Sequence, residues 1–298
     1  MITVQLNGRL GNQMFQYAAA RALAHRWQTE VRFDLSLLQS TGVEYQLSCF
    51  GIPPRAASAD ELPFRQRQGT AALVRRTKSL SERLLPFVRK TVFSDEPFTF
   101  ESDFFDHASN CYLRGFFQNE AYFSQIAGVI RKEFTVRAPL SDQTQQLLAI
   151  MKESAAVSVH VRRGDYIENA SYNGYFGTCS VDYYARACAA MRAEISSPVF
   201  IFFSDDPTWV RAVALPALQD KGLVTDYVVV DWTHSAHPSE DIHLMKSACH
   251  HIIANSSFSW WGAWLNAKTS KKVIAPDRWL KELSSDSIVP RGWDRIPN

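Results

Sequence analysis

The sequence lacks most of the features that would place it in a specialised class of protein. Its five cysteines are an odd number without any C-x-x-C spacing, which argues against a disulfide framework and a cysteine-based zinc site. Its eight histidines form no H-E-x-x-H or H-x-x-x-H pattern. No run of about 18 apolar residues exists, and the N-terminus has no basic and apolar leader, so we expect neither a membrane span nor a signal peptide.

The chain also lacks an excess of charge of either sign. A formal net charge of +2 argues against nucleic acid as the main partner. What remains is the composition of a folded globular protein, with 46% hydrophobic and 21% charged residues among 298. Free cysteines fit a reducing compartment, so we expect a soluble protein of the cytoplasm.

An apolar strand, a short polar loop and a helix follow one another three times, beginning at Met1, Ser197 and His250. This alternation predicts α/β units with mostly parallel sheets. A helix capped by Ser141 leads into a further buried strand near residue 155. We place a boundary there, which gives an N-terminal lobe of residues 1–150 and a C-terminal lobe of residues 151–298 facing each other across a cleft.

The strand "AVSVHV" ends at two arginines, Arg162 and Arg163, followed by Gly164 and Asp165. Ligands of open α/β sheets bind at the carboxyl ends of the strands. A guanidinium group binds phosphate oxygens in a bidentate manner. Because successive side chains of a strand point in opposite directions, only one of the two arginines can face a ligand, and the other braces the loop. The alternative is a structural pair between an arginine and Asp165.

Two other segments present helix starts. In "ANSSFSWWGAW", Asn255 or Ser256 is a good N-cap, and the helix start after it suits a phosphate, although a plain capped core helix explains the same pattern. In "NGRLGNQ", the glycine spacing is neither G-x-G-x-x-G nor a Walker loop, which disfavours a dinucleotide oxidoreductase. There the glycines allow close approach of the backbone, and Asn12 lies at a helix start.

Three further sites with aspartate or histidine side chains have two interpretations each. Asp205 and Asp206 are typical of a divalent metal site, but helix capping before Pro207 is favoured. The His250–His251 pair on an apolar strand indicates a hydrogen-bonded core pair rather than metal ligands. Asp241, near the start of a helix, either faces the helix dipole or accepts the edge donors of a purine such as guanine.

Four long motifs together resemble a known family. They are, in order, "GRLGNQMFQYAAARALA", "VSVHVRRGDY", "FIFFSDDPTWV" and "DIHLMKSACHHIIANSSFSWWGAWL". This set resembles the bacterial α-1,2-fucosyltransferases of the eleventh glycosyltransferase family. The resemblance implies a two-lobed GT-B fold and metal-independent, inverting transfer of fucose from GDP-L-fucose to the 2-hydroxyl of a galactoside. It also implies a role in surface polysaccharide (O-antigen) synthesis, with a galactose-terminated acceptor, either free or lipid-linked, held by the N-terminal lobe.

The same resemblance assigns residues to the donor, GDP-fucose, in the C-terminal lobe. By similarity to other fucosyltransferases, His160 and Asp241 contact guanine, and Arg162 holds the β-phosphate beside Ser256 and Ser257. Asn12 resembles the asparagine that protein O-fucosyltransferases place near the reacting fucose. An arginine and a helix start aimed at the leaving phosphate stabilise the transition state, in which that phosphate gains negative charge.

Inversion calls for a base opposite the leaving group. Asp165 is the nearest candidate in the sequence, and the acidic set Asp103, Asp106 and Glu120 is the alternative. The basic segment 65–90, with eight lysines and arginines and one glutamate, is either a solvated face or a peripheral contact with an anionic membrane surface. A different sugar or linkage, and a nucleotide-binding module without turnover, are the competing functions.

We predict that Asp165→Asn lowers turnover by about a hundredfold or more and leaves GDP binding intact, since an amide cannot accept the acceptor proton. Initial-rate kinetics and GDP titration of the same variant measure both quantities. A parallel loss of GDP affinity would assign Asp165 to the structural pair instead.

Overall fold

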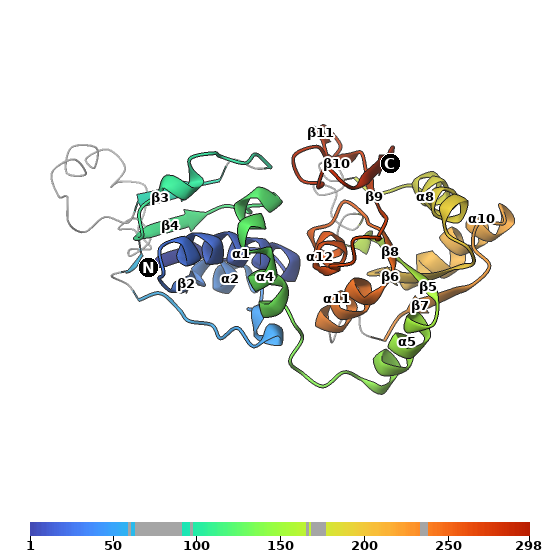
Figure 1. Ribbon diagram of the computed structural model, residues 1–298, viewed down its shortest axis with the longest axis horizontal. Helices are drawn as coiled ribbons and strands as arrows, with labels where there is room; N and C mark the ends of the chain where they lie inside the picture. The colour runs from blue at the N-terminus through green and yellow to red at the C-terminus, as the bar shows by residue number, and fades with distance from the viewer. Residues whose placement is uncertain (59–60, 63–90, 96–97, 165–166, 168–176, 233–237) are drawn as a thin grey trace. The chain divides into compact units, whose positions relative to one another are not determined.

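The computed structural model of the chain describes residues 1–58, 61–62, 91–95, 98–164, 167, 177–232 and 238–298. These residues form two compact units, each with its own parallel sheet (Figure 1). The first unit comprises Met1–Ser48 and Ile52–Ile130, and the second comprises Cys49–Gly51 and Arg131–Asn298. The asparagine and arginine motifs of the sequence therefore belong to different units.

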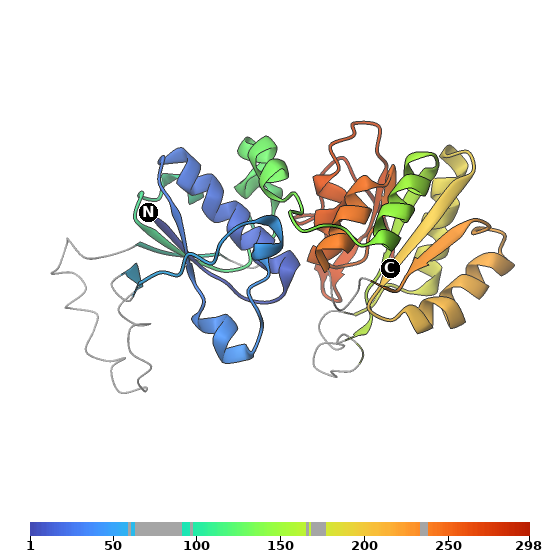
Figure 2. The same cartoon turned by 90° about the horizontal axis from the view of Figure 1, so that it is seen from below.

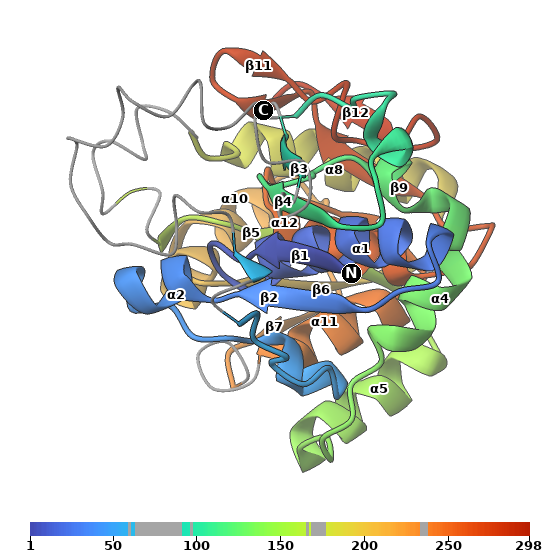
Figure 3. The same ribbon diagram turned by 90° about the vertical axis from the view of Figure 1, so that its left-hand side faces the viewer.

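The first unit contains a sheet of four strands in the order β2-β1-β4-β3, in which every neighbouring pair is parallel. The strands are β1 (Ile2–Gln5), β2 (Val31–Asp34), β3 (Thr91–Ser94) and β4 (Cys111–Arg114). They lie side by side next to the alanine-rich helix α1 (Leu10–Arg26), as Figure 3 shows. The other helical elements are α2 (Ser36–Thr41), η4 (Phe104–Asp106), η5 (Glu120–Tyr122) and η6 (Ser124–Ile126), while η1 (Leu47–Phe50) and α4 (Ala127–Glu133) are each divided between the two units.

The second unit contains a sheet of six parallel strands in the order β12-β9-β8-β5-β6-β7. Its strands are β5 (Ala155–Val161), β6 (Pro198–Ser204), β7 (Tyr227–Val230), β8 (His250–Ile252), β9 (Val273–Pro276) and β12 (Asp294–Ile296). A separate antiparallel pair is formed by β10 (Arg278–Leu280) and β11 (Leu283–Ser284). The helices are α5 (Asp142–Lys152), α8 (Val181–Glu194), α9 (Pro207–Trp209), the π-turn η7 (Val210–Ala214), α10 (Leu215–Asp220), α11 (Pro238–Ser247) and α12 (Ser257–Leu265).

Successive side chains of a strand point to opposite faces of the sheet, and this divides the core of the second unit into two layers. Val157 and Phe202 belong to the layer under α8 and α10, whereas Ala156 and Phe203 belong to the layer under α5 and α11. Figure 2 shows helices on both sides of this sheet. Because both faces are covered, the strands are continuously apolar, as the sequence predicted.

The division between the units falls earlier than the boundary that we placed at residue 150. Helix α5 belongs to the second unit, where Leu147 and Met151 pack in the same layer as residues of α11. Ser141 caps α5 as expected, its Oγ accepting a hydrogen bond from Thr144 N over 3.4 Å. The same hydroxyl donates to Glu240 of α11 over 2.6 Å, which ties the two helix starts together.

None of the helices within the described ranges combines the length and the apolarity needed to cross a membrane. The basic segment 65–90, for which we considered a membrane contact, lies outside the described residues. The membrane contact stays a hypothesis.

A buried polar network crosses the second sheet at His251 of β8. The His251 ring is fully buried, with Nδ1 at 2.8 Å from Ser158 Oγ and Nε2 at 2.8 Å from Asn266 Nδ2. The Asn266 amide donates to Nε2, so Nδ1 carries the proton and faces the Ser158 hydroxyl. The prediction of a hydrogen-bonded core histidine is thus confirmed for His251, while its neighbour His250 is only half-buried and accepts from the backbone N–H of Lys272.

Burial lowers the pKa of His251 well below its ordinary value of 6.5, and the nearby Lys271, His250 and Lys268 lower it further. The folded protein therefore holds this ring neutral at a pH where the unfolded chain binds a proton. Its contribution to stability is complete above about pH 6.5 and is lost as the pH falls below that value.

We predict that the free energy of unfolding decreases between pH 6.5 and 5.5 and that His251→Asn reduces this slope by up to about 1.4 kcal/mol per pH unit. Urea titrations at several pH values measure the slope. His25→Asn, at an exposed position of α1, is the matched control and keeps the wild-type slope. An unchanged slope in His251→Asn would contradict the argument.

Candidate active site

Three loops meet at the carboxyl edge of the second sheet because β8, β5 and β6 are adjacent and parallel. Arg162 and Arg163 follow β5, Asp205 and Asp206 follow β6, and Ser256 lies between β8 and α12. Strand order reverses between β5 and β8. The strands β6 and β7 lie on one side of β5, whereas β8 and β9 lie on its other side. Such a switch point is where open α/β sheets bind ligands.

Arg162 is held at this switch point by Asp205. Its Nη1 lies 2.8 Å from Asp205 Oδ2, and the two side chains retain only 16% and 7% of their exposure. Asp205 Oδ1 also accepts a hydrogen bond of 2.8 Å from the backbone N–H of Arg163. One carboxylate therefore fixes both the guanidinium group and the loop that carries it.

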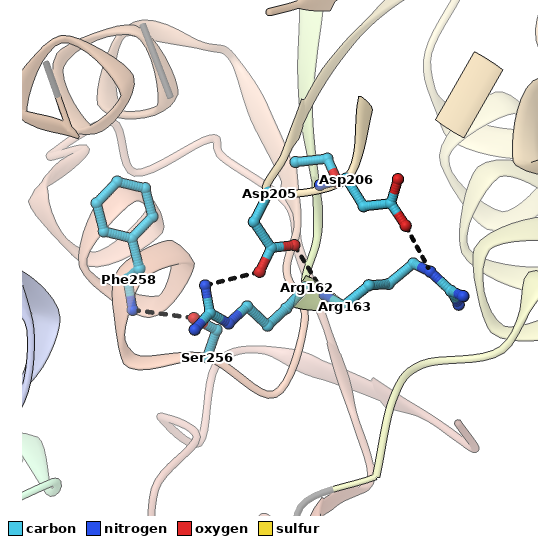
Figure 4. A network of polar contacts seen from close by, with 7 residues as sticks. Arg162, Arg163, Asp205, Asp206, Ser256 and Phe258 are labelled. Atoms are coloured by element: carbon cyan, nitrogen blue, oxygen red, sulfur yellow. Dashed lines mark hydrogen bonds and ion pairs between the residues drawn. The ribbon is translucent and has the colours of Figure 1, made fainter. Parts of the chain in front are cut away.

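Figure 4 shows the guanidinium of Arg162 between Asp205 and the first turn of α12. Ser256 is the N-cap of α12, and its Oγ accepts a hydrogen bond of 3.3 Å from Phe258 N. This confirms the predicted cap at Ser256, whereas Asn255 instead donates to the carbonyls of Gly177 and Trp279. The positive end of the α12 dipole adds to the charge of Arg162, and Ser257 is the first residue of that helix.

Arg163 takes the bracing role that strand alternation predicted for one of the two arginines. Its guanidinium lies 4.0 Å from the centre of the Trp209 ring, and Nε is 3.4 Å from Asp206 Oδ2. Asp206 is also the N-cap of α9, its Oδ1 accepting from Trp209 N over 2.9 Å. The prediction that Asp205 or Asp206 caps the helix at Pro207 is confirmed, with Asp206 as the cap, while Asp205 pairs with Arg162.

Gly164 leaves the space that this arrangement needs. A Cβ atom at this position would lie 2.8 Å from Asp205 Oδ2, closer than real Cβ contacts allow. The next residue, Asp165, lies outside the described residues, so its proposed role as base or structural partner stays a prediction.

His160 and Asp241 lie on the side of the second sheet covered by α11. His160 shares the face of β5 with Ala156, is almost fully buried and has its ring centre 5.8 Å from that of Phe258. Asp241 is in the first turn of α11 and is 2% exposed. Glu240 anchors that turn by accepting hydrogen bonds from Ser141 Oγ and Ser141 N, over 2.6 and 3.2 Å.

Asn12 belongs to the first unit, in the first turn of α1 as predicted. Its Oδ1 accepts a hydrogen bond of 2.8 Å from Gln118 Nε2. Of the acidic alternatives for a base, Asp103 and Asp106 are exposed around η4, and Glu120 is half-buried in η5.

Sequence reasoning missed two pairings, that of Arg162 with Asp205 in the second unit and that of Asn12 with Gln118 in the first. The position of Asp205 in the sequence could have indicated its contact with Arg162, because Asp205 directly follows a strand that neighbours β5 in a parallel sheet. Gln118 follows β4 in the same way, four residues after Arg114.

Comparisons with known proteins agree with this architecture. The family model "Glycosyl transferase family 11" matches residues 89–296. The O-antigen biosynthesis glycosyltransferase WbnK of Escherichia coli is 28% identical over 97% of this chain and 98% of its own length. An alpha-1,2-colitosyltransferase of the same species is 28% identical over 99% of both chains. The human galactoside alpha-(1,2)-fucosyltransferase 1 is 26% identical over 88% of this chain and 65% of its own.

Among solved structures, a point mutant of Arabidopsis thaliana FUT1 in complex with GDP is similar, with a TM-score of 0.51. It is 11% identical and covers 92% of this chain and 70% of that chain, so the likeness concerns the fold alone. The α/β units with parallel sheets have the GT-B type of fold. The protein is a glycosyltransferase, and the chain belongs to glycosyltransferase family 11.

Proposed function

We propose that the protein transfers L-fucose from GDP-L-fucose to the 2-hydroxyl of a terminal galactose, with inversion, in the synthesis of a surface polysaccharide such as O-antigen. The observation that carries this proposal is Arg162, held by Asp205 at the switch point beside the start of α12. The names of the family relatives, which include α-1,2-fucosyltransferases and an O-antigen enzyme, support the linkage and the pathway.

The proposed chemistry uses Arg162 on the leaving group. As the bond between fucose and GDP breaks, the β-phosphate gains negative charge and the sugar becomes oxocarbenium-like. Arg162 and the N–H groups around Ser256 and Ser257 stabilise that charge more in the transition state than in the ground state. Because Asp205 fixes the guanidinium beforehand, little reorganisation accompanies the reaction.

His160 and Asp241 are the proposed guanine contacts. A carboxylate accepts hydrogen bonds from two donors on one edge of guanine, and Asp241 is fixed in a helix start that α5 anchors through Glu240. In the first unit, Asn12 is the proposed contact to fucose. Asp165 is the proposed base, with Asp103, Asp106 and Glu120 as the alternatives.

The proposed reaction needs neither a metal ion nor another cofactor. In many nucleotide-sugar enzymes a divalent cation neutralises the pyrophosphate, and here a guanidinium and a helix start offer positive charge to it. The adjacent carboxylates Asp205 and Asp206, which the sequence offered as metal ligands, each lie against an arginine. Both carboxylates are thereby balanced by protein charge.

Transfer of colitose is the second candidate, favoured by the relative named alpha-1,2-colitosyltransferase. Colitose differs from fucose by the absence of the 3-hydroxyl. The groups proposed to hold GDP and its phosphates would serve either donor, so the choice rests on contacts to that one hydroxyl.

We predict that the purified protein releases GDP from GDP-fucose when a β-galactoside such as lactose is present, and that the fucose is found on the galactose 2-hydroxyl. Excess EDTA leaves the rate unchanged. Product linkage is read by NMR, and GDP-colitose is run in parallel. A higher kcat/KM for GDP-colitose would select the second candidate, a metal requirement would contradict the cofactor proposal, and GDP binding without turnover would favour a binding module.

We predict that Asp205→Asn lowers kcat/KM by about a hundredfold, because the guanidinium of Arg162 loses the charged partner that orients it. Asp206→Asn is the matched control. It loses at most about fivefold, since asparagine is an equally good N-cap and the pair of Arg163 and Asp206 is partly exposed. Steady-state kinetics of both variants test this, and equal losses would show that Asp205 does not position Arg162.

A further inference from the structure

The carboxyl edge of the first sheet repeats the layout of the second. Its strand order also reverses, here between β1 and β4, because β2 lies on one side of β1 while β4 and β3 lie on the other. Asn12 follows β1 and Gln118 follows β4, and their hydrogen bond of 2.8 Å spans this switch point. The two residues are 106 positions apart in the chain.

The oxygen of the Asn12 side-chain amide is held by Gln118. Within residues 10–20 of α1, all of them described, Asn12 is the one residue that is not buried. Gln118 Nε2 donates to Asn12 Oδ1, so the oxygen of the Asn12 amide faces Gln118. Asn12 Nδ2 is turned the other way, over Gly8, where an added Cβ would lie 2.4 Å from that nitrogen.

The backbone immediately before Gln118 is held in place by Asp95. Asp95, directly after β3, accepts hydrogen bonds from Phe116 N and Phe117 N over 3.1 and 2.8 Å through Oδ2. Its Oδ1 accepts one of 2.8 Å from Tyr122 Oη. Burial raises the pKa of Asp95, and the three donors oppose that rise. A carboxylate thus fixes the loop that carries Gln118.

The backbone next to Gln118 is strained. Phe117 has a φ of +53°, a left-handed conformation that bulky residues seldom adopt. Its ring is fully buried and stacks at 6.1 Å on Phe93 and edge-on at 5.3 Å against Tyr122. Such strain persists where the surroundings enforce it, and it is concentrated at functional sites.

We propose that Gln118 is a positioning residue that fixes the Asn12 amide, with Oδ1 toward Gln118 and Nδ2 presented as a donor to an oxygen of the transferred sugar. This inference rests on the proposed function for the identity of that sugar. Gln118 does not need to touch the sugar, since it acts through the orientation of Asn12.

The test compares the wild type with Gln118→Glu, Gln118→Met and the control Asn119→Ser. A glutamate only accepts hydrogen bonds, so it turns Asn12 Nδ2 toward itself, whereas methionine removes the donor and keeps the volume. Serine at position 119 keeps the cap that Asn119 gives to Ala121 N in the same loop. The measured quantities are kcat, the KM for GDP-fucose, the dissociation constant of GDP and the melting temperature.

We expect kcat to fall about a hundredfold in Gln118→Glu, because the contact between Asn12 and the sugar is misoriented. In Gln118→Met, which loses one hydrogen bond, we expect kcat to fall about tenfold. The KM for GDP-fucose and the GDP dissociation constant stay near the wild-type values in both variants. The melting temperature stays near the wild-type value in Gln118→Met, whereas the buried carboxylate of Gln118→Glu lowers it, and Asn119→Ser keeps full activity. Wild-type kcat in both variants at position 118, or a kcat of Gln118→Met that falls only together with the melting temperature, overturns the proposal.

A second readout is independent of the donor. The side-chain amide signals of Asn12 in ¹⁵N spectra are expected to shift in both variants at position 118 and to stay in place in Asn119→Ser. If the wild type transfers no fucose but these signals shift, the proposed function fails while the positioning of Asn12 stands. Unshifted signals overturn the role of Gln118 whatever the sugar.

Discussion

The parallel register of β5 with β6 and β8 is the constraint on which the site of the second unit depends. Neighbouring parallel strands end at the same edge of the sheet. The pairing of the strands therefore brings loops that are distant in sequence together, and strong contacts between the loops are not needed. The arginines after β5, the aspartates after β6 and the cap of α12 after β8 meet for this reason. The covering of both sheet faces by helices leaves that edge as the place for polar side chains.

A half-buried guanidinium is costly unless it is paired, and its pairing explains several local features at once. Asp205 gives Arg162 its partner and at the same time accepts the backbone N–H of Arg163. Gly164 is required because any side chain there would press on that carboxylate. Arg163, with Trp209 and Asp206, stiffens the opposite side of the loop. The motif V-R-R-G and the motif S-D-D-P are therefore two halves of one structure.

Local features could be predicted from the sequence, because each depends on a few neighbouring residues. The caps at Ser141, Asp206 and Ser256, the parallel sheets and the bracing role of one arginine all follow from such patterns. The pairings Arg162–Asp205 and Gln118–Asn12 join residues whose nearness exists only after the strands are ordered. Strand order is set by packing of both faces, which no local pattern contains. The division between the units was misplaced for the same reason, since α5 is assigned by its contacts with α11.

The two switch points differ in the chemistry that holds the functional side chain, and the difference follows from what each is proposed to bind. A phosphate carries charge, so the second unit presents a guanidinium and fixes it with a carboxylate. A sugar is neutral and offers oxygens that donate and accept, so its contacts depend on which atom of an amide faces it. In the first unit an amide is fixed by another amide, and the carboxylate of Asp95 acts one step further back, on the loop. The charge of the Arg162 guanidinium is balanced by a carboxylate in direct contact with it, whereas the Asp95 carboxylate acts on the orientation of an amide through the backbone of the loop.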